Sequence, residues 1–370
     1  MPRRSNRRRP VQHLGMCVVS MVAAWTSLPA QAQTIDPALL KAPEVSVSHV
    51  AMSRTGDLFV VARVFRKPNW QIKGYTLSFY ALDGDSVALL SRVSVPGIVS
   101  GLCWFGAEDD QVLCLVALPA AENAVAPAIL RLSATGNQFD ATNAPSDPLW
   151  FPVVDDRTEQ LFAMGMLTRQ IWTVSLDCLG TPQQLTFGQE IPPVGFSLGG
   201  ESTLWCVTRY RGRNSDGPCE SDLVRLDFEL RLSRSWKVYR DVHTVRVSPD
   251  GRYLACISSD CPSKAGDEVT QLRVYDLRTM HEQFRIEPFS TYQLAWSSDS
   301  SQLLALTGAD AATLLDLHRI DAPRTEPVQL PPGSRTAVPM WSEAQQCFVV
   351  CARESVLMVR PSSVREIPFE

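Results

Sequence analysis

A short pattern recurs seven times along this chain, and it constrains the fold more than any other feature. Each copy has an apolar anchor residue, a short polar turn and a returning run of apolar residues. The clearest copy, V-R-V-S-P-D-G-R-Y-L-A-C-I-S, spans residues 245–258. Successive anchors lie 42 to 52 residues apart, a spacing typical of repeat proteins that stack similar units. The seven anchors are Met52, Trp104, Val154, Phe196, Val247, Trp296 and Trp341.

Within one repeat the sequence predicts four β-strands. In the repeat around Val247, a β-rich stretch leads to the turn sequence Pro-Asp-Gly, and the returning strand is apolar on both faces. An alternating strand and a more polar one follow, and the polar one suits an outer edge. We therefore predict an all-β protein, a single seven-bladed β-propeller of four-stranded antiparallel blades. The four predicted strands span residues 244–248, 253–258, 271–276 and 281–286.

The repeats divide residues 33–370 into seven predicted blades. The last blade can supply its own fourth strand near Val364 to Phe369, but residues Thr34 to Val45 offer an alternative strand for that edge. The sequence leaves both modes of ring closure open. The predicted blades span residues 45–98, 99–149, 150–191, 192–241, 242–290, 291–335 and 336–370.

Residues 1–32 have the pattern of a secretory signal peptide. Five arginines precede a mostly apolar stretch from Leu14 to Leu28, and Ala30-Gln31-Ala32 is a small-residue cleavage site. The apolar stretch is short for a membrane span, which needs about 20 residues, although an uncleaved anchor remains the alternative. We expect cleavage after Ala32, a periplasmic or secreted protein, and no stable membrane span.

The charge of the chain argues against some classes of partner. Loss of residues 1–32, with five arginines and no acidic residue, would change the formal net charge from −4 to −9. An acidic body disfavours nucleic acid as the partner. We expect an envelope or secreted protein as partner, and the oligomeric state stays open.

Nine cysteines follow the predicted cleavage site, and an odd number leaves at least one thiol unpaired or bonded to another chain. Cys206 and Cys256 occupy the same apolar strand position in their repeats, so we expect both to be buried. The best candidate disulfide joins Cys219 to Cys261, which lie in corresponding polar loops. The disulfide state remains open.

Four loops are predicted to be long, and strand alternation places them on one face of the propeller. They span residues 64–75, 118–127, 209–221 and 259–268. Two of them combine cations with aromatic residues, a composition enriched at protein interfaces. The alternative is that they are ordinary solvated loops, with Trp70 packed against its own blade. The candidate binding residues are Arg66, Lys67, Trp70, Lys73, Arg209, Tyr210, Arg211 and Arg213.

The sequence contains no recognisable catalytic set. His49 and His243 each precede a predicted first strand by a few residues, a position typical of structural histidines. No phosphate-binding loop and no zinc-spaced cluster is present. We therefore predict no catalytic residue, no metal site and no cofactor. A ligand site assembled at the propeller axis from distant residues, as in a lactonase, hydrolase or lyase, is the alternative.

One repeat resembles a known family. Residues 247–255, V-S-P-D-G-R-Y-L-A, match the motif W-S-P-D-G-K-x-[IL]-A of the TolB-like, WD40-related propeller repeat. Trp296-Ser297-Ser298-Asp299 and Trp341-Ser342-Glu343 are degenerate copies, and Tyr275-Asp276 stands where WD40 proteins carry Trp-Asp. The resemblance covers about residues 45–370 and implies a protein-binding scaffold of the cell envelope. TolB has an α/β domain before its propeller, whereas here only about a dozen residues separate the predicted cleavage site from the first strand.

These observations favour an exported, non-enzymatic propeller that binds a protein partner in the periplasm or cell envelope. The alternative is a propeller enzyme or small-ligand binder with its site at the axis.

Overall fold

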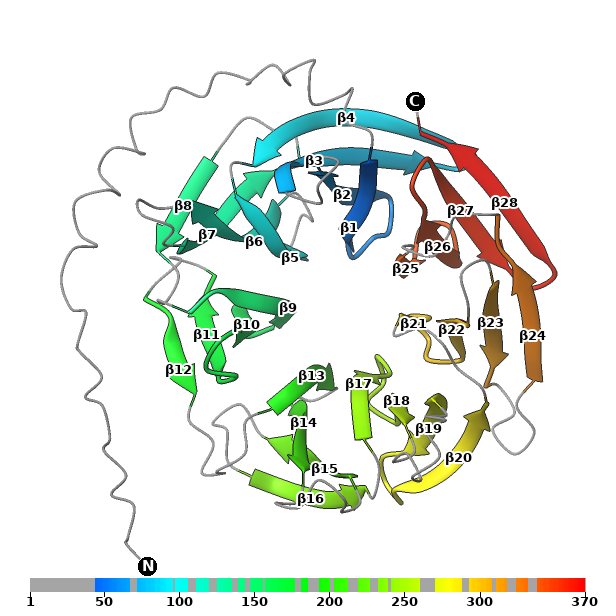
Figure 1. Cartoon of the computed structure of the whole chain (residues 1–370). Coiled ribbons are helices and arrows are strands. Elements are labelled where there is room, and N and C mark those ends of the chain that lie inside the picture. The colour runs from blue at the N-terminus through cyan, green and yellow to red at the C-terminus, as the bar shows by residue number, and fades with distance from the viewer. Residues whose placement is uncertain are drawn as a thin grey trace, which may run out of the picture.

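The protein is a ring of seven four-stranded β-sheets in this computed structural model (Figure 1). The predicted all-β, seven-bladed propeller is thereby confirmed. Among the residues that the structure describes, no helix is long and apolar enough to span a membrane. The predicted signal peptide lies outside the described residues. Those residues are 44–66, 72–95, 97–105, 111–119, 125–134, 139–143, 147–155, 157–176, 181–185, 193–199, 203–211, 219–226, 232–238, 241–259, 270–287, 293–307, 311–317, 324–331 and 338–369.

Each blade consists of four strands that follow one another in the sequence. Blade 1 contains β1 (Glu44–Met52), β2 (Leu58–Arg66), β3 (Ile72–Asp83) and β4 (Ser86–Val95). Blade 2 contains β5 (Ile98–Phe105), β6 (Gln111–Pro119), β7 (Val125–Ser133) and β8 (Phe139–Asn143). Blade 3 contains β9 (Leu149–Asp155), β10 (Gln160–Gly165), β11 (Ile171–Ser175) and β12 (Gln183–Leu185). Blade 4 contains β13 (Pro193–Gly199), β14 (Thr203–Arg211), β15 (Cys219–Leu226) and β16 (Leu232–Val238).

The remaining three blades repeat this plan. Blade 5 contains β17 (Asp241–Val247), β18 (Tyr253–Ser259), β19 (Thr270–Asp276) and β20 (His281–Ile286). Blade 6 contains β21 (Leu294–Trp296), β22 (Gln302–Leu306), β23 (Ala311–Asp316) and β24 (Arg324–Gln329). Blade 7 contains β25 (Val338–Ser342), β26 (Cys347–Cys351), β27 (Ser355–Arg360) and β28 (Ser363–Pro368).

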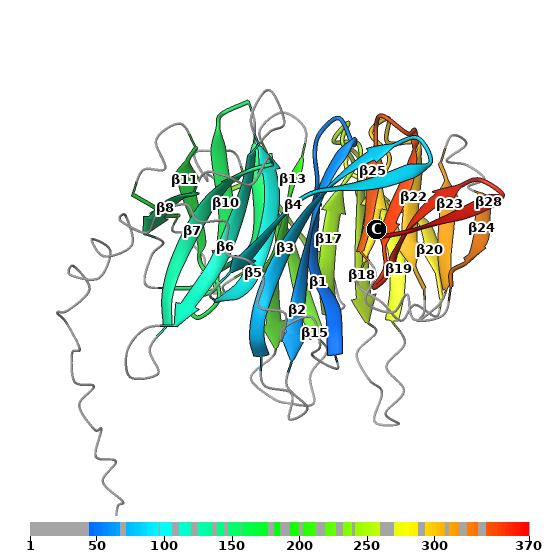
Figure 2. The same cartoon turned by 90° about the horizontal axis from the view of Figure 1, so that it is seen from above.

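The first strand of each blade lies nearest the axis of the ring and the fourth lies at the rim (Figure 1). Neighbouring strands are antiparallel, and seen from the side they run between the two faces of the ring (Figure 2). One face therefore carries the turns that join first to second and third to fourth strands, and we call it the turn face. The other face carries the second-to-third-strand connections and the starts of the inner strands, and we call it the connection face.

The core lies between neighbouring sheets, because each sheet buries both of its faces. The second strands are apolar on both sides, as in β2, where Phe59, Val60 and Val61 are fully buried. Val60 packs toward blade 2 and Val61 toward blade 7, since they belong to two different apolar clusters. A single blade could not bury both faces, so the ring is the unit that folds.

Two of the tryptophan anchors also join neighbouring blades by hydrogen bonds. The indole Nε1 of Trp104 donates to the carbonyl oxygen of Ala51 at 2.8 Å, and that of Trp296 donates to the carbonyl oxygen of Arg246 at 3.1 Å. Both side chains are 8% exposed. The anchors thus combine apolar burial with a satisfied polar edge, which buried indoles require.

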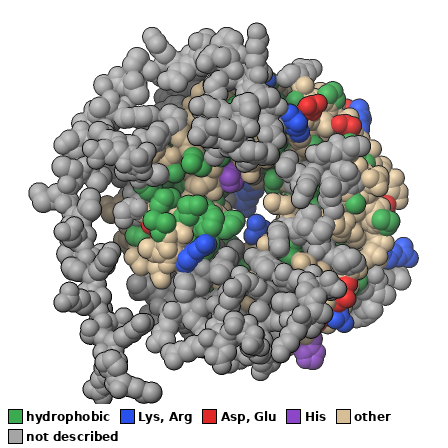
Figure 3. All heavy atoms as spheres, viewed as in Figure 1, with side chains coloured by type: hydrophobic (Ala, Val, Ile, Leu, Met, Phe, Trp, Pro, Cys, Tyr) green, Lys and Arg blue, Asp and Glu red, His purple; other side chains and the backbone are tan. Residues whose placement is uncertain are grey.

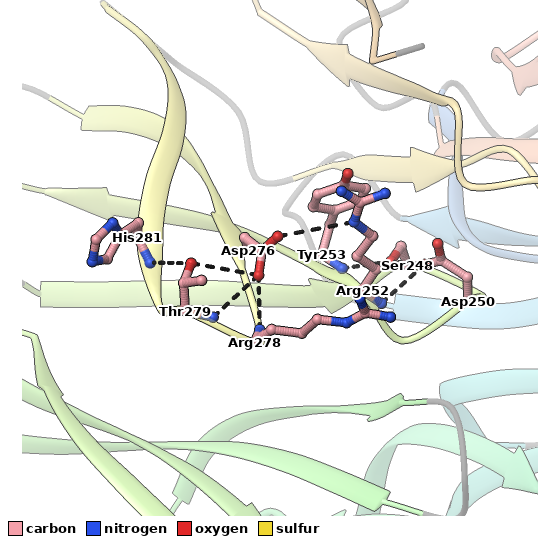
Figure 4. A network of polar contacts seen from close by, with 8 residues as sticks. All are labelled: Ser248, Asp250, Arg252, Tyr253, Asp276, Arg278, Thr279 and His281. Carbon is pink, nitrogen blue, oxygen red and sulfur yellow. Dashed lines mark hydrogen bonds and ion pairs between the residues drawn. The ribbon is translucent and has the colours of Figure 1, made fainter. Parts of the chain in front are cut away.

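In blade 5, the repeat nearest to the family motif, polar side chains link two turns on the turn face (Figure 4). Ser248 Oγ accepts the backbone N–H of Tyr253 at 2.9 Å and donates to Asp250. Asp276 Oδ1 accepts the N–H groups of Arg278 and Thr279, at 2.8 and 3.1 Å. The residues of the motif therefore satisfy the backbone of the turns.

The ring closes by side-by-side packing of blades 1 and 7, and β28 is the fourth strand of blade 7. Ser342 Oγ donates to the carbonyl oxygen of Gly56 at 2.6 Å, and a Cβ at Gly56 would lie only 2.5 Å from the backbone nitrogen of Glu343. Phe369 stacks against Tyr80 with 4.8 Å between ring centroids, and the guanidinium of Arg63 lies 4.5 Å from the Phe369 ring. Of the two closure modes that the sequence left open, the chain uses a blade of consecutive strands.

The described cysteines that were expected to be buried are buried. Cys206 in β14 and Cys256 in β18 are 2% and 0% exposed. Burial raises the pKa of the Cys206 thiol far above its ordinary value, so this thiol is unreactive at neutral pH. Cys219 begins β15, while Cys261 lies outside the described residues, so their predicted disulfide stays a prediction.

Candidate functional site

The structure places five of the eight predicted binding residues on strand ends rather than in loops. Arg66 ends β2 and Lys73 lies one residue into β3, while Arg209, Tyr210 and Arg211 form the last three residues of β14. Their side chains, and the whole of Lys67, Trp70 and Arg213, lie outside what the structure describes. The loops predicted at 64–75 and 209–221 are thus shorter than expected, because antiparallel pairing continues to Arg66 opposite Ile72 and to Arg211 opposite Cys219.

These two basic segments do not form one patch. Both lie on the connection face, where second strands end, but one belongs to blade 1 and the other to blade 4. Blades 2 and 3 separate them along one side of the ring (Figure 1). A surface that uses both would have to cross blade 3.

Blade 3 exposes the large apolar side chains that lie between the two basic segments. Phe151 is 49% exposed, Met166 45% and Leu167 75%. Ile98, at the start of the neighbouring inner strand β5, is 45% exposed. Figure 3 shows hydrophobic side chains gathered over blade 3 beside the axis, with a cation at their edge. We call Trp150, Phe151, Met166, Leu167 and Arg169 the blade-3 corner.

A β-bulge in the inner strand turns Phe151 outward. Trp150 pairs with Met164 and Val153 pairs with Phe162, so Phe151 and Pro152 together face one residue of β10. Phe151 has φ = 51°, a left-handed conformation that is costly for an aromatic residue. Strain at an exposed aromatic residue is a recognised mark of recognition sites.

The neighbouring blade is shaped to accept this bulge. Gly101 in β5 lies against Pro152, and a Cβ at Gly101 would be 2.3 Å from the proline Cδ. Ser100 Oγ donates to the carbonyl oxygen of Leu149. In blades 1 and 2 the bulge residues are Ser48 and Ser100, whose hydroxyl groups donate to carbonyl oxygens of the adjacent strand. In blade 3 an exposed aromatic ring replaces this serine.

The turn that carries Met166 and Leu167 is held by one buried carboxylate. Asp147, 3% exposed, accepts the N–H of Leu167 on Oδ1 at 2.8 Å and the N–H of Thr168 on Oδ2 at 3.0 Å. The Thr168 hydroxyl also donates to Oδ2, and Met166 N–H donates to the carbonyl oxygen of Pro148 at 2.7 Å. The turn is therefore fixed to the segment entering β9, and Leu167 projects from a rigid base.

Arg169 supplies the cation of the corner. Its guanidinium carbon lies 4.7 Å from the ring centroid of Trp150, a cation–π contact, and the tilted rings of Trp150 and Phe151 pack with 5.0 Å between centroids. Arg169 also has a left-handed backbone, with φ = 58°. Trp150 Nε1 is buried and has no hydrogen-bond partner among the described residues. The corner thus brings one cation and two aromatic rings into contact.

Sequence reasoning missed this site, because it favoured long loops and the loop after β10 is short. The available signal was the pair Met166-Leu167, two large apolar residues in a turn where polar residues are usual. The exposure of Phe151 depends on the bulge and on Pro152 meeting Gly101. Neither feature can be read from local sequence.

Around the axis, the described residues bring together few groups capable of acid–base chemistry. His49 Nδ1 lies 3.2 Å from Ser48 Oγ, and burial lowers the pKa of His49 to about 4, so its imidazole is neutral at pH 7. Asp155, at the end of the inner strand β9, accepts a hydrogen bond from Thr158 in its own turn. No group of three or more metal-ligating side chains is found in the described segments.

The comparisons with known proteins establish the fold alone. No protein-family model matches the sequence, and no curated protein matches it. The structure resembles a solved complex of KlAtg21 with the coiled coil of AgAtg16, with TM-score 0.60, 12% identity, and 88% of this chain and 100% of that one covered. A chain of the mitotic checkpoint complex gives TM-score 0.58 and 10% identity, over 95% and 96% of the two chains. A chain of Kuenenia stuttgartiensis hydrazine synthase gives TM-score 0.55 and 10% identity, over 88% and 96%. The fold is thus a WD40-like seven-bladed propeller, one that also occurs in an enzyme complex.

Proposed function

We propose that this protein is an exported, non-enzymatic β-propeller scaffold that binds a protein partner in the periplasm or cell envelope. The observation that carries the proposal is the blade-3 corner, where a rigid framework holds Phe151 and Leu167 in solvent. Clustered aromatic, aliphatic and arginine side chains are the residues that dominate protein interfaces. The TolB-like motif at residues 247–255 and the signal-peptide pattern support export to the envelope.

Two of the similar structures are assemblies, one of them with a coiled coil. Propellers use the rigid ring to present loops and strand ends to such partners. The basic strand ends at Arg66 and Arg211 lie on the same connection face as the corner. We propose that this face carries the partner.

The test is a crosslinked pull-down from the native cell envelope with tagged full-length protein. We expect reproducible capture of one envelope protein. Capture should be reduced in the variant Leu167→Ser and in a second variant with Arg66, Lys67, Trp70 and Arg211 changed to alanine. Cell fractionation should place the tagged protein in the periplasm. Failure to capture any protein, or a cytoplasmic location, would contradict the proposed function.

A further inference from the structure

We infer that the blade-3 corner binds a segment of a partner protein that presents bulky apolar side chains beside a carboxylate. The inference rests on the proposed function, because it names the chemistry of the partner that the scaffold would hold. It follows from three features of the corner: exposed apolar area, a fixed and unneutralised cation, and a basic strand end in the adjacent blade.

The apolar part of the corner is preorganised. Leu167 is 75% exposed, yet the backbone on both sides of it is hydrogen-bonded, by Asp147 to residues 167 and 168 and by Pro148 to Met166. Phe151 is held outward by the bulge in β9. A site that is already rigid loses little conformational entropy on binding, so its exposed apolar area can contribute to affinity. An apolar side chain of the partner is the occupant that gains from this area.

The cation of the corner is oriented and has no described acidic partner. The guanidinium carbon of Arg169 lies over the Trp150 ring, 4.7 Å from its centroid. A guanidinium can still bind a planar carboxylate through its N–H groups. The nearby carboxylate of Asp147 is occupied by the N–H groups and hydroxyl of its own turn. Among the described residues, no carboxylate forms a salt bridge with Arg169. An acidic group on the partner would complete this arrangement.

The adjacent blade also carries arginine residues at the connection face. Arg209 and Arg211 lie at the end of β14. Blade 4 follows blade 3 in the ring (Figure 1). The chain as a whole carries a formal net charge of −4. An acidic partner segment would therefore be attracted to the arginines of blades 3 and 4, although the net negative charge of the whole protein repels it.

A narrow peptide segment suits the corner better than a flat membrane surface. Among the described residues, the large exposed apolar side chains of the connection face belong to blade 3 and to the start of β5. The other large exposed apolar side chains that are described, Leu90 and Val364, lie on the outer strands of blades 1 and 7. We therefore assign the corner to a protein segment and keep the membrane as an outcome of the test.

The experiment selects peptides from a random 12-residue display library on protein purified after expression of the full chain. We expect the enriched peptides to combine Leu, Ile, Phe or Met with Asp or Glu. In fluorescence anisotropy with one enriched peptide, Leu167→Ser should weaken binding tenfold or more, and Arg169→Gln threefold to tenfold. Binding should also weaken as the salt concentration rises.

Two matched variants control for the changes themselves. Leu90→Ser removes a leucine of blade 1 that is 48% exposed. Arg157→Gln removes an arginine from the turn face of blade 3. Both should bind the peptide as the unaltered protein does. Equal losses in Leu167→Ser and Leu90→Ser, or in Arg169→Gln and Arg157→Gln, would overturn the assignment.

Other outcomes also overturn it. Enriched peptides without acidic residues, or no enrichment at all, would contradict the proposed chemistry. Binding to phosphatidylglycerol vesicles that is lost in Leu167→Ser but kept in Leu90→Ser would assign the corner to a membrane instead. If the pull-down captures an envelope protein while these peptide results fail, the scaffold function survives and only the corner is excluded.

Discussion

In blade 5 the polar side chains of the turns bond to their own backbone, whereas in blade 3 a turn presents large apolar side chains to water. Ser248 and Asp276 satisfy backbone N–H groups on the turn face. On the connection face of blade 3, the carboxylate of Asp147 likewise accepts backbone N–H groups, and the turn that it holds exposes Met166 and Leu167. The same type of polar capping therefore stabilises the ring in one blade and positions exposed residues in the other.

The inner strands show the same difference. In β17 the bulge lies between Val242 and Thr244, and the Val242 side chain is buried. In β9 the bulge contains an exposed phenylalanine in a left-handed conformation. Departure from the repeat pattern in blade 3 thus coincides with strain and exposure, which structural residues avoid.

The largest effect is expected for Asp147→Ala. The substitution leaves the N–H groups of Leu167 and Thr168 without their acceptor, and we expect a loss of about 3 kcal/mol in the free energy of unfolding. The released turn should also weaken peptide binding about tenfold. Chemical denaturation and fluorescence anisotropy measure the two quantities.

The matched substitution in blade 5 is Asp276→Ala, which also removes a carboxylate that accepts two backbone N–H groups. Here we expect a loss of about 1–2 kcal/mol in stability and no change in peptide binding. If both aspartate variants weaken binding equally, the contrast between the two blades is wrong.

The second-largest effect is expected from acid, which should lower the stability of the propeller without lowering the affinity of the blade-3 corner for peptide. The pKa of His49 is about 4 in the folded protein and 6.5 in the unfolded chain, because burial disfavours the imidazolium. Between these values the unfolded chain binds a proton that the folded one does not, so stability falls as the pH drops from 6.5 toward 4. From pH 7 to 5.5 we expect a loss of about 1 kcal/mol that is absent in His49→Gln.

Urea denaturation at both pH values measures this difference. Peptide affinity should change little over the same range, because His49 lies in blade 1 and not in the blade-3 corner. An identical pH dependence in the protein and in His49→Gln would show that His49 is accessible to protons in the folded state.

The smallest effect on stability is expected for Phe151→Gly. Glycine adopts φ = 51° without strain, so the free energy of unfolding should stay the same or rise by up to about 1 kcal/mol. Peptide binding should fall several-fold, because the exposed ring is lost. Thermal denaturation measures the change in stability, and fluorescence anisotropy measures the change in peptide affinity. Together they test whether the strained backbone at Phe151 serves peptide binding.

Glu159→Gly is the control for this substitution. Glu159 has φ = 52° and lies in the turn between β9 and β10, on the turn face of the same blade. It should gain stability to a similar degree and bind the peptide unchanged. A lower stability of Phe151→Gly would mean that packing of the Phe151 ring stabilises the protein by more than the strained backbone costs.

The fold could be predicted from the sequence because its signals are local. The turn from Ser248 to Gly251 and the strand that follows it are enough to predict one blade. The seven regularly spaced anchors predict the number of blades. The strand ends were less accessible: Arg209 to Arg211 looked like loop residues, but pairing with β15 extends over them. The corner could not be predicted, because the exposure of Phe151 depends on Pro152 meeting Gly101 from another blade.

Ring closure by a complete seventh blade has a consequence for the order of the chain. Among the described strands, no sheet combines strands from both ends of the sequence, and a hydrogen bond from Ser342 to Gly56 joins blade 7 to blade 1. A circularly permuted gene, opened between any two blades and joined by a linker across the present ends, would therefore split no sheet. The ring fixes which blades are neighbours, but it leaves the starting blade free to vary during evolution.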